Sequence, residues 1–111
     1  MDFPTAQTKA LSFRHERDWE QFHNPKDLAI SISLEAAELL ECFQWSGTAT
    51  DVPARHQEMC DELADVLIYC IYLADELGVS IPEAISAKID QDALKYPVSK
   101  ARGNSRKYTE L

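Results

Sequence analysis

The 111-residue chain is poor in residues that interrupt regular structure and in residues that cross-link a fold, since it contains 3 Gly, 5 Pro and 3 Cys. Together with a hydrophobic content of 45%, this scarcity of breakers excludes a disordered or low-complexity chain. The cysteines form no Cys-x-x-Cys pair, which argues against a disulfide framework and against a zinc site. We therefore expect a globular protein with reduced thiols.

Long apolar runs are also missing. No run approaches the ~20 residues that a membrane-spanning helix requires. The first residues, Met1-Asp2-Phe3-Pro4, lack the basic and then apolar order of a secretory signal. These absences predict a cytoplasmic protein that does not bind membranes.

Positive charge is scarce and unevenly placed. The chain has 11 Lys and Arg against 19 Asp and Glu, and 5 of the 11 basic residues lie in residues 93–111. The acidic remainder argues against binding to nucleic acid or to an anionic membrane. The basic end is either a solvated terminus or a clamp for a polyanionic ligand. We predict a helical domain over residues 1–97 and a basic tail over residues 98–111.

Helix signals dominate the sequence. Asn24 followed by Pro25 is typical of a helix start, and Gly78 of a helix end. Residues 28–34 alternate like a strand, but they continue without a break into strong helix formers, so we interpret them as helix. We predict an all-α four-helix bundle that forms oligomers. Its helices are expected over about residues 4–22, 24–45 and 53–77, and from a capping box at Ser80 and Glu83 to Lys95.

A repeated spacing of carboxylates is the most informative pattern. Glu35 and Glu38 are three residues apart in the second predicted helix, as are Glu62 and Asp65 in the third. Positions i and i+3 lie about 60° apart on a helix, so each pair points one way. Each pair also lies next to apolar positions that we expect in the core, which are Leu34 and Leu39 in the one helix and Leu63 and Val66 in the other. If the two helices are antiparallel neighbours, the two pairs can converge.

Four converging carboxylates require neutralisation. No Lys or Arg lies between Lys26 and Arg55, or between Arg55 and Lys88. A hard divalent cation, Mg²⁺ or Mn²⁺, would suit an all-oxygen site, and such ions commonly complete their coordination with substrate phosphates. The alternative is that both pairs are solvated surface charge. A di-iron site is disfavoured because the i+3 partners of Glu35 and Glu62 are Glu38 and Asp65 rather than His.

Aromatic residues offer a second component of a site. Trp19, Trp45, Tyr69 and Tyr96 lie at the rims of the apolar stripes. They either pack in the core and at helix ends or form a slot in which a nucleobase stacks.

At these residues the sequence resembles the all-α nucleoside triphosphate pyrophosphohydrolases of the MazG type, and most closely their dCTP pyrophosphatase branch. The resemblance covers almost the whole chain. The segments that carry it are Glu16-Arg17-Asp18-Trp19-Glu20-Gln21-Phe22-His23, Glu35-Ala36-Ala37-Glu38-Leu39, Phe43-Gln44-Trp45, Asp61-Glu62-Leu63-Ala64-Asp65-Val66-Leu67-Ile68-Tyr69, Lys95-Tyr96-Pro97 and Lys107-Tyr108-Thr109-Glu110-Leu111.

The resemblance implies a Mg²⁺-dependent hydrolase that cleaves a nucleoside triphosphate, such as dCTP or a related or modified pyrimidine deoxynucleotide, into the monophosphate and pyrophosphate. It implies homodimers or homotetramers in which two subunits form each site. The implied Mg²⁺ ligands are Glu35, Glu38, Glu62 and Asp65, and the implied base and sugar pocket contains Trp19, His23, Trp45 and Tyr69.

Other roles are left open by the sequence. Glu38 and Glu35 are the catalytic candidates, and the sequence does not decide which carboxylate takes the proton from water. Lys88 and Lys95 are candidates for phosphate contacts, and Tyr96 and Asp92 for contact with the nucleotide.

Two positions depart from the dCTP pyrophosphatase branch. Asp92 stands where that branch usually has Asn, and Ala10 where some relatives have His. Both departures weaken a transfer of cytosine specificity. The alternative to an enzyme is a helical oligomer that acts as a protein-interaction module through the apolar face of residues 53–77.

Overall fold

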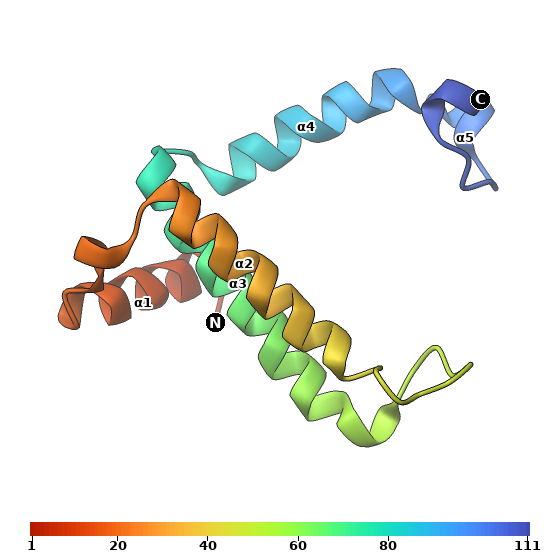
Figure 1. Cartoon of the computed structure of the whole chain (residues 1–111). Helices are drawn as coiled ribbons and strands as arrows, with labels where there is room; N and C mark the ends of the chain where they lie inside the picture. The colour runs from red at the N-terminus through yellow and green to blue at the C-terminus, as the bar shows by residue number, and fades with distance from the viewer. The chain divides into compact units, whose positions relative to one another are not determined.

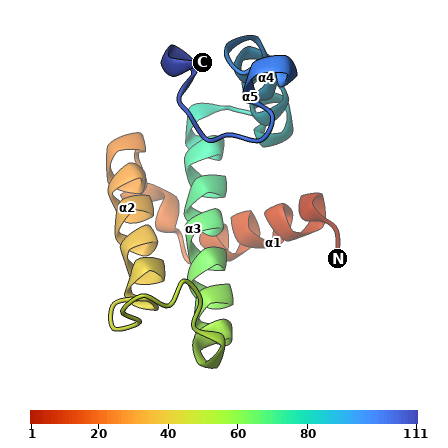
Figure 2. The same ribbon diagram turned by 90° about the vertical axis from the view of Figure 1, so that its right-hand side faces the viewer.

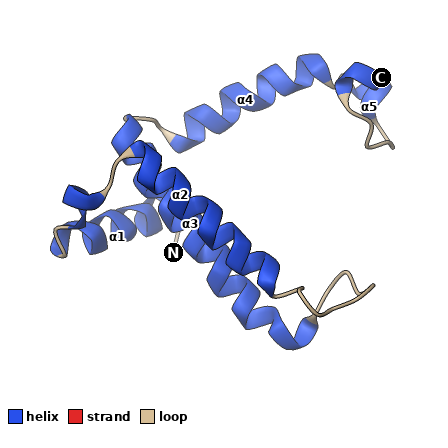
Figure 3. Cartoon of the chain, in the orientation of Figure 1, coloured by secondary structure: helices blue, strands red, loops and turns tan.

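The computed structural model describes all residues from 1 to 111, and it is helical without any strand, as predicted (Figure 3). It divides into two compact units, Met1–Gly78 and Val79–Leu111. None of its helices combines the length and the apolarity needed to cross a membrane. The elements in chain order are α1 (Phe3–Glu16), η1 (Trp19–Phe22), α2 (Pro25–Glu41), η2 (Pro53–Arg55), α3 (His56–Leu77), α4 (Ile81–Lys95), α5 (Val98–Ala101) and η3 (Tyr108–Glu110).

Helices α2 and α3 lie side by side and run in opposite directions, and this pair is the framework of the first unit (Figure 1). The predicted start of α2 is confirmed, because the Asn24 side chain accepts a hydrogen bond from the backbone N–H of Asp27 at 2.9 Å. Residues 28–34 are helical, as interpreted from the sequence. The predicted end at Trp45 is wrong, since α2 ends at Glu41 and hydrogen-bonded turns follow.

Helix α3 ends where the sequence predicted and begins slightly later. Gly78 has φ 67°, the left-handed conformation that terminates many helices and that glycine adopts without strain. Residues 53–55 form a 3₁₀ turn, so the α-helix begins at His56 rather than at Pro53. Pro53 lacks the N–H group that a helix interior would use, which fits a position at the start of this turn.

Helix α1 is shorter than predicted and lies across α3 (Figure 2). The prediction of a continuous helix to residue 22 is wrong, because Asp18 adopts φ 52° and ψ 40° and interrupts the helix. Short side chains such as Asp tolerate this left-handed conformation, which ends α1 without Gly or Pro. Residues 19–22 then form the 3₁₀ turn η1.

In the second unit, α4 ends at Lys95 ahead of Pro97, as predicted. The predicted capping box is wrong, since the Ser80 side chain makes no capping hydrogen bond. The Tyr108 ring of the tail packs edge-on against Tyr96, with centroids 5.9 Å apart. A bundle of all four long helices stays a prediction, because α4 belongs to a different unit from α1, α2 and α3.

The single chain has a small core. Of the residues expected beside it, Leu34 and Leu63 are 61% and 50% exposed, so the prediction that they are buried is wrong for the single chain. The buried residues are Leu28, Cys42, Ile71, Tyr72, Ala74 and one charged residue, Arg14.

Candidate metal centre and aromatic pocket

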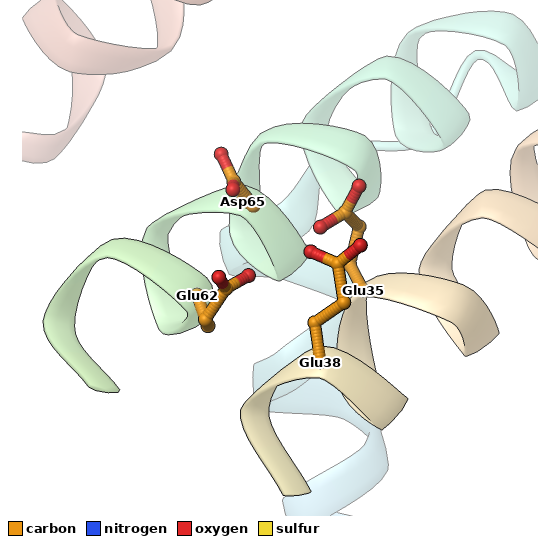
Figure 4. Close-up of side chains that lie close together, drawn as sticks. All are labelled: Glu35, Glu38, Glu62 and Asp65. Atoms are coloured by element: carbon orange, nitrogen blue, oxygen red, sulfur yellow. The ribbon is translucent and has the colours of Figure 1, made fainter. Parts of the chain in front are cut away.

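The four carboxylates predicted to converge do converge (Figure 4). Glu35 and Glu38 project from α2, and Glu62 and Asp65 from α3. One carboxylate oxygen from each residue lies within 4.8 Å of those of the other three. The i, i+3 spacing aligns each pair on its own helix, and the antiparallel packing of α2 against α3 then brings the two pairs together.

This cluster has no cationic partner within the chain, since no Lys or Arg forms an ion pair with any of its members. The pKa of Glu62 is raised to about 6, first by loss of hydration and then by hydrogen bonding with Glu38 and the charges of the other cluster members. The pKa of Glu35 is also raised, first by burial and then by Glu38. The cluster therefore holds negative charge at an energetic cost.

The donor set fits a hard divalent cation. One oxygen of Glu35 and one of Glu62 are buried and have no hydrogen-bond partner, so both are available as ligands. Carboxylate oxygens are the ligands that Mg²⁺ and Mn²⁺ prefer, whereas zinc sites usually include sulfur or nitrogen. The residues that could hold the ion are Glu35, Glu38, Glu62 and Asp65.

A largely apolar pocket of about 570 Å³ adjoins this cluster. It lies between α1 with η1 on one side and α3 on the other, and Asp65 belongs to both the pocket and the carboxylate cluster. Aromatic side chains beside a charged, solvent-accessible group favour the binding of a base that is attached to a charged group. Its lining residues are Phe3, Ala6, Lys9, Ala10, Phe13, Trp19, Ala64, Asp65, Leu67, Ile68, Tyr69, Ile71 and Tyr72.

The structure brings together some of the predicted pocket residues. Trp19 and Tyr69 both line the pocket. His23 stacks on Tyr72, a lining residue, with ring centroids 5.4 Å apart and planes at 27°. Trp45 does not reach the pocket of its own chain, because it lies in the turn after α2 and is 86% exposed.

Comparison with known proteins agrees with this arrangement. Residues 30–111 match the model of the MazG-like family. The chain belongs to the MazG-like family. It is 42% identical over 104 residues to dCTP pyrophosphatase 1 of Rattus norvegicus and 43% identical over 104 residues to that of Homo sapiens, which covers 89% of this chain and 61% of each relative.

A solved structure supports the fold of this MazG-like chain. A pyrophosphatase from Archaeoglobus fulgidus superposes with a TM-score of 0.77 at 39% sequence identity, covering 85% of this chain and 91% of that one. The curated relatives are longer, since the chain spans about 61% of their length.

The remaining candidate residues of the MazG-like chain lie in the second unit. Lys88 and Asp92 form an ion pair with each other at 3.3 Å on the surface of α4. The Lys95 ammonium lies 5.0 Å from the centroid of the Tyr108 ring, which also contacts Tyr96. Contacts of these four predicted residues with a nucleotide stay predictions.

Two pocket residues, Phe13 and Tyr72, and the buried Arg14 were not identified from the sequence. Phe13 lies edge-on to Trp19 with centroids 5.6 Å apart, so α1 and η1 form one aromatic wall. Tyr72 lies three residues after Tyr69, a spacing that places both on one face of α3, and this signal could have found it. The burial of Arg14 had no sequence signal, because charged side chains in amphipathic helices are usually solvated.

Proposed function

We propose that this MazG-like chain is a Mg²⁺-dependent nucleoside triphosphate pyrophosphohydrolase. It cleaves the α–β phosphoanhydride and releases the monophosphate and pyrophosphate. The preferred substrate is dCTP or a related or modified pyrimidine deoxynucleotide, in keeping with the name of its curated relatives. The observation that carries the proposal is the position of Asp65, which lines the aromatic pocket and also belongs to the carboxylate cluster.

The carboxylate cluster would hold Mg²⁺, or alternatively Mn²⁺, through Glu35, Glu38, Glu62 and Asp65. When bound, a divalent cation supplies charge neutralisation for phosphate oxygens and makes water more acidic. Within the site, the partly buried Glu35 and Glu62 are shielded from solvent, whereas Glu38 is exposed.

The pocket would bind and orient the nucleotide. Trp19 and Tyr69 present ring faces and edges to the base, and base–aromatic contacts of this kind tolerate different bases. Because Asp65 lies at the junction of pocket and cluster, a nucleotide bound by its base directs its phosphates towards the carboxylates. The ordering of the α-phosphate beside this cluster reduces the entropy cost of the reaction.

Glu38 is the residue that we assign to accept the proton of the attacking water. Its side chain is exposed and therefore reachable by water, and a carboxylate oxygen can hold the proton during attack. Glu35 lies one turn away, and it is the second candidate for this role.

The proposal includes assembly into homodimers or homotetramers. On α2, Leu34 and Leu40 are 61% and 70% exposed, and on α3 Leu63 and Leu67 are 50% and 46% exposed. Exposed large apolar side chains in such number are typical of a chain that binds protein. A second copy would cover them and would supply the residues that the single-chain pocket lacks, with Trp45 the foremost candidate.

The same exposed face supports the alternative function, a non-catalytic helical oligomer that binds a protein partner. The two functions differ in what the carboxylates do. An interaction module requires no bound ion and no conversion of a nucleotide, and it would keep its function after substitution of Glu38.

The test is to incubate the protein with dCTP and Mg²⁺ and to separate the products by ion-exchange chromatography. We expect dCMP and pyrophosphate in equal amounts, and loss of this activity by at least about 10²-fold in Glu38→Gln. Asp61→Asn is the matched control, because Asp61 lies on α3 next to Glu62 but bonds to Gln57 outside the cluster. Formation of dCDP and orthophosphate would contradict the cleavage position, and absence of turnover with all common triphosphates would favour the interaction module.

A further inference from the structure

A buried arginine stands apart from the carboxylate cluster and joins α1 to α3. Arg14, on α1, is only 3% exposed. Its guanidinium forms ion pairs with Asp75 and, at 3.1 Å, with Glu76 in the last turn of α3. The C-terminal end of a helix carries partial negative charge, so these two acidic side chains are unfavourable there without a cation. Arg14 neutralises both with a planar group that can serve two acceptors.

Arg14 also contacts a pocket residue from behind. Its guanidinium carbon lies 5.0 Å from the centroid of the Tyr72 ring, a cation–π distance. Tyr72 is 3% exposed and lines the pocket. Its ring is held on further sides by His23, at a centroid distance of 5.4 Å, and by Tyr69, at 6.0 Å. The Tyr72 ring therefore has little freedom to move.

Tyr72 in turn fixes the opposite wall of the pocket. Its hydroxyl donates a hydrogen bond to the backbone carbonyl of Ala10 at 3.0 Å, and Ala10 lines the pocket from α1. Burial raises the pKa of the Tyr72 hydroxyl, which keeps it protonated as a donor. The chain of contacts therefore runs from the end of α3 through Arg14 and Tyr72 to the α1 wall.

All side-chain polar contacts between α1 and α3 belong to this chain of contacts. The earlier part of α1 supplies Phe3, Ala6 and Lys9 to the pocket, and it faces α3 without a hydrogen bond or an ion pair. The wall is thus anchored at one end, and a change at the anchor would displace its free end.

We propose that Arg14 is a positioning residue that, through Tyr72, sets the width of the pocket between α1 and α3. This inference rests on the proposed function, because the width matters for a base held between these walls. A displaced wall would weaken binding of the base equally before and during reaction. Such a loss raises KM and leaves kcat nearly unchanged.

The experiment compares Arg14→Lys with the wild-type protein. Lys keeps the positive charge but loses the planar fork and its stacking on an aromatic ring. We expect KM for dCTP to rise about tenfold with kcat within about twofold of wild type. Amide hydrogen exchange of residues 3–13 should accelerate by about tenfold, while exchange in α2 stays unchanged.

A second variant and a control isolate the cause. Tyr72→Phe keeps the ring and removes only the hydroxyl that reaches Ala10, so it should raise KM in the same direction by a smaller factor. Arg55→Lys makes the same chemical change at an ion pair with Glu58 that lies away from α1, and it should leave KM unchanged.

The outcomes separate this inference from the proposed function. A wild-type protein that hydrolyses no nucleoside triphosphate would contradict the function itself. If the wild-type protein is active and both variants keep its KM, the positioning role is overturned. A lower kcat at unchanged KM would also overturn it, because that result indicates only a smaller fraction of folded protein. Unchanged hydrogen exchange of α1 in Arg14→Lys would overturn the anchor.

Discussion

Glu38 on α2 and Glu62 on α3 are neighbours in space although they belong to different helices, and hydrogen bonding between their carboxyl groups helps to hold the pKa of Glu62 at about 6. This proximity stores repulsion in the folded protein, since both groups would be solvated and far apart in the unfolded chain. A bound cation would relieve this repulsion. The stability of the protein should therefore report on the site even before an activity is measured.

The first prediction concerns pH. The pKa of Glu62 is raised from 4.5 to about 6 in the folded state, so the folded protein binds a proton more tightly than the unfolded one. The stabilisation from this proton is fully present below about pH 4.5 and is lost as pH rises through about 6. In EDTA, the difference in Tm between Glu62→Gln and wild type should grow in favour of the variant from pH 4.5 to 7.5. A constant difference over this range would contradict the shifted pKa.

The second prediction concerns metal binding. Glu38→Gln should make the metal-free protein slightly more stable, by roughly 0.2–0.5 kcal/mol for the i, i+3 repulsion with Glu35. Mg²⁺ at about 100 times its Kd should stabilise wild type by about 2.7 kcal/mol, and this response should be lost in the variant. Thermal unfolding with and without Mg²⁺ measures both effects. Equal responses of Glu38→Gln and wild type would exclude Glu38 as a ligand.

The third prediction concerns the aromatic pocket. Trp19→Ala should weaken nucleotide binding by about 1–3 kcal/mol, the usual contribution of a stacked base. Phe22→Ala is the matched control, because Phe22 lies in the same turn η1 but is 66% exposed and outside the pocket. Titration calorimetry with a non-hydrolysable dCTP analogue measures the affinities. A larger loss in Phe22→Ala than in Trp19→Ala would show that the base binds elsewhere.

The fourth prediction concerns assembly. Leu40 is 70% exposed on α2, so Leu40→Lys should leave the stability of the single chain within about 0.5 kcal/mol of wild type. If a second copy covers this face, the same substitution should shift the protein towards the monomer in analytical ultracentrifugation. Gln91→Lys is the control, because it adds the same single positive charge at an exposed position of α4. A wild-type protein that is monomeric at all concentrations would contradict the proposed oligomer.

Local signals predicted most helix ends correctly, and the failures have identifiable causes. Asn24 and Gly78 act through their own backbone and nearest neighbours, so their effect is visible in the sequence. The break at Asp18 is different, because an Asp is compatible with both helical and left-handed backbone and the choice depends on how η1 packs. The capping box failed because a Ser and a Glu at the right spacing permit the hydrogen bond without enforcing it.

The sequence by itself determined that each pair of carboxylates shares one helix face, because the pitch of an α-helix fixes which way residues three apart point. Tertiary structure decided that the two pairs meet, since only the antiparallel packing of α2 and α3 brings Glu38 to Glu62. It also decided the packing of α1 against α3, in which Arg14 reaches Asp75 across 61 residues of chain. Contacts at such separation depend on the packing of whole helices, and no local preference of the sequence encodes them.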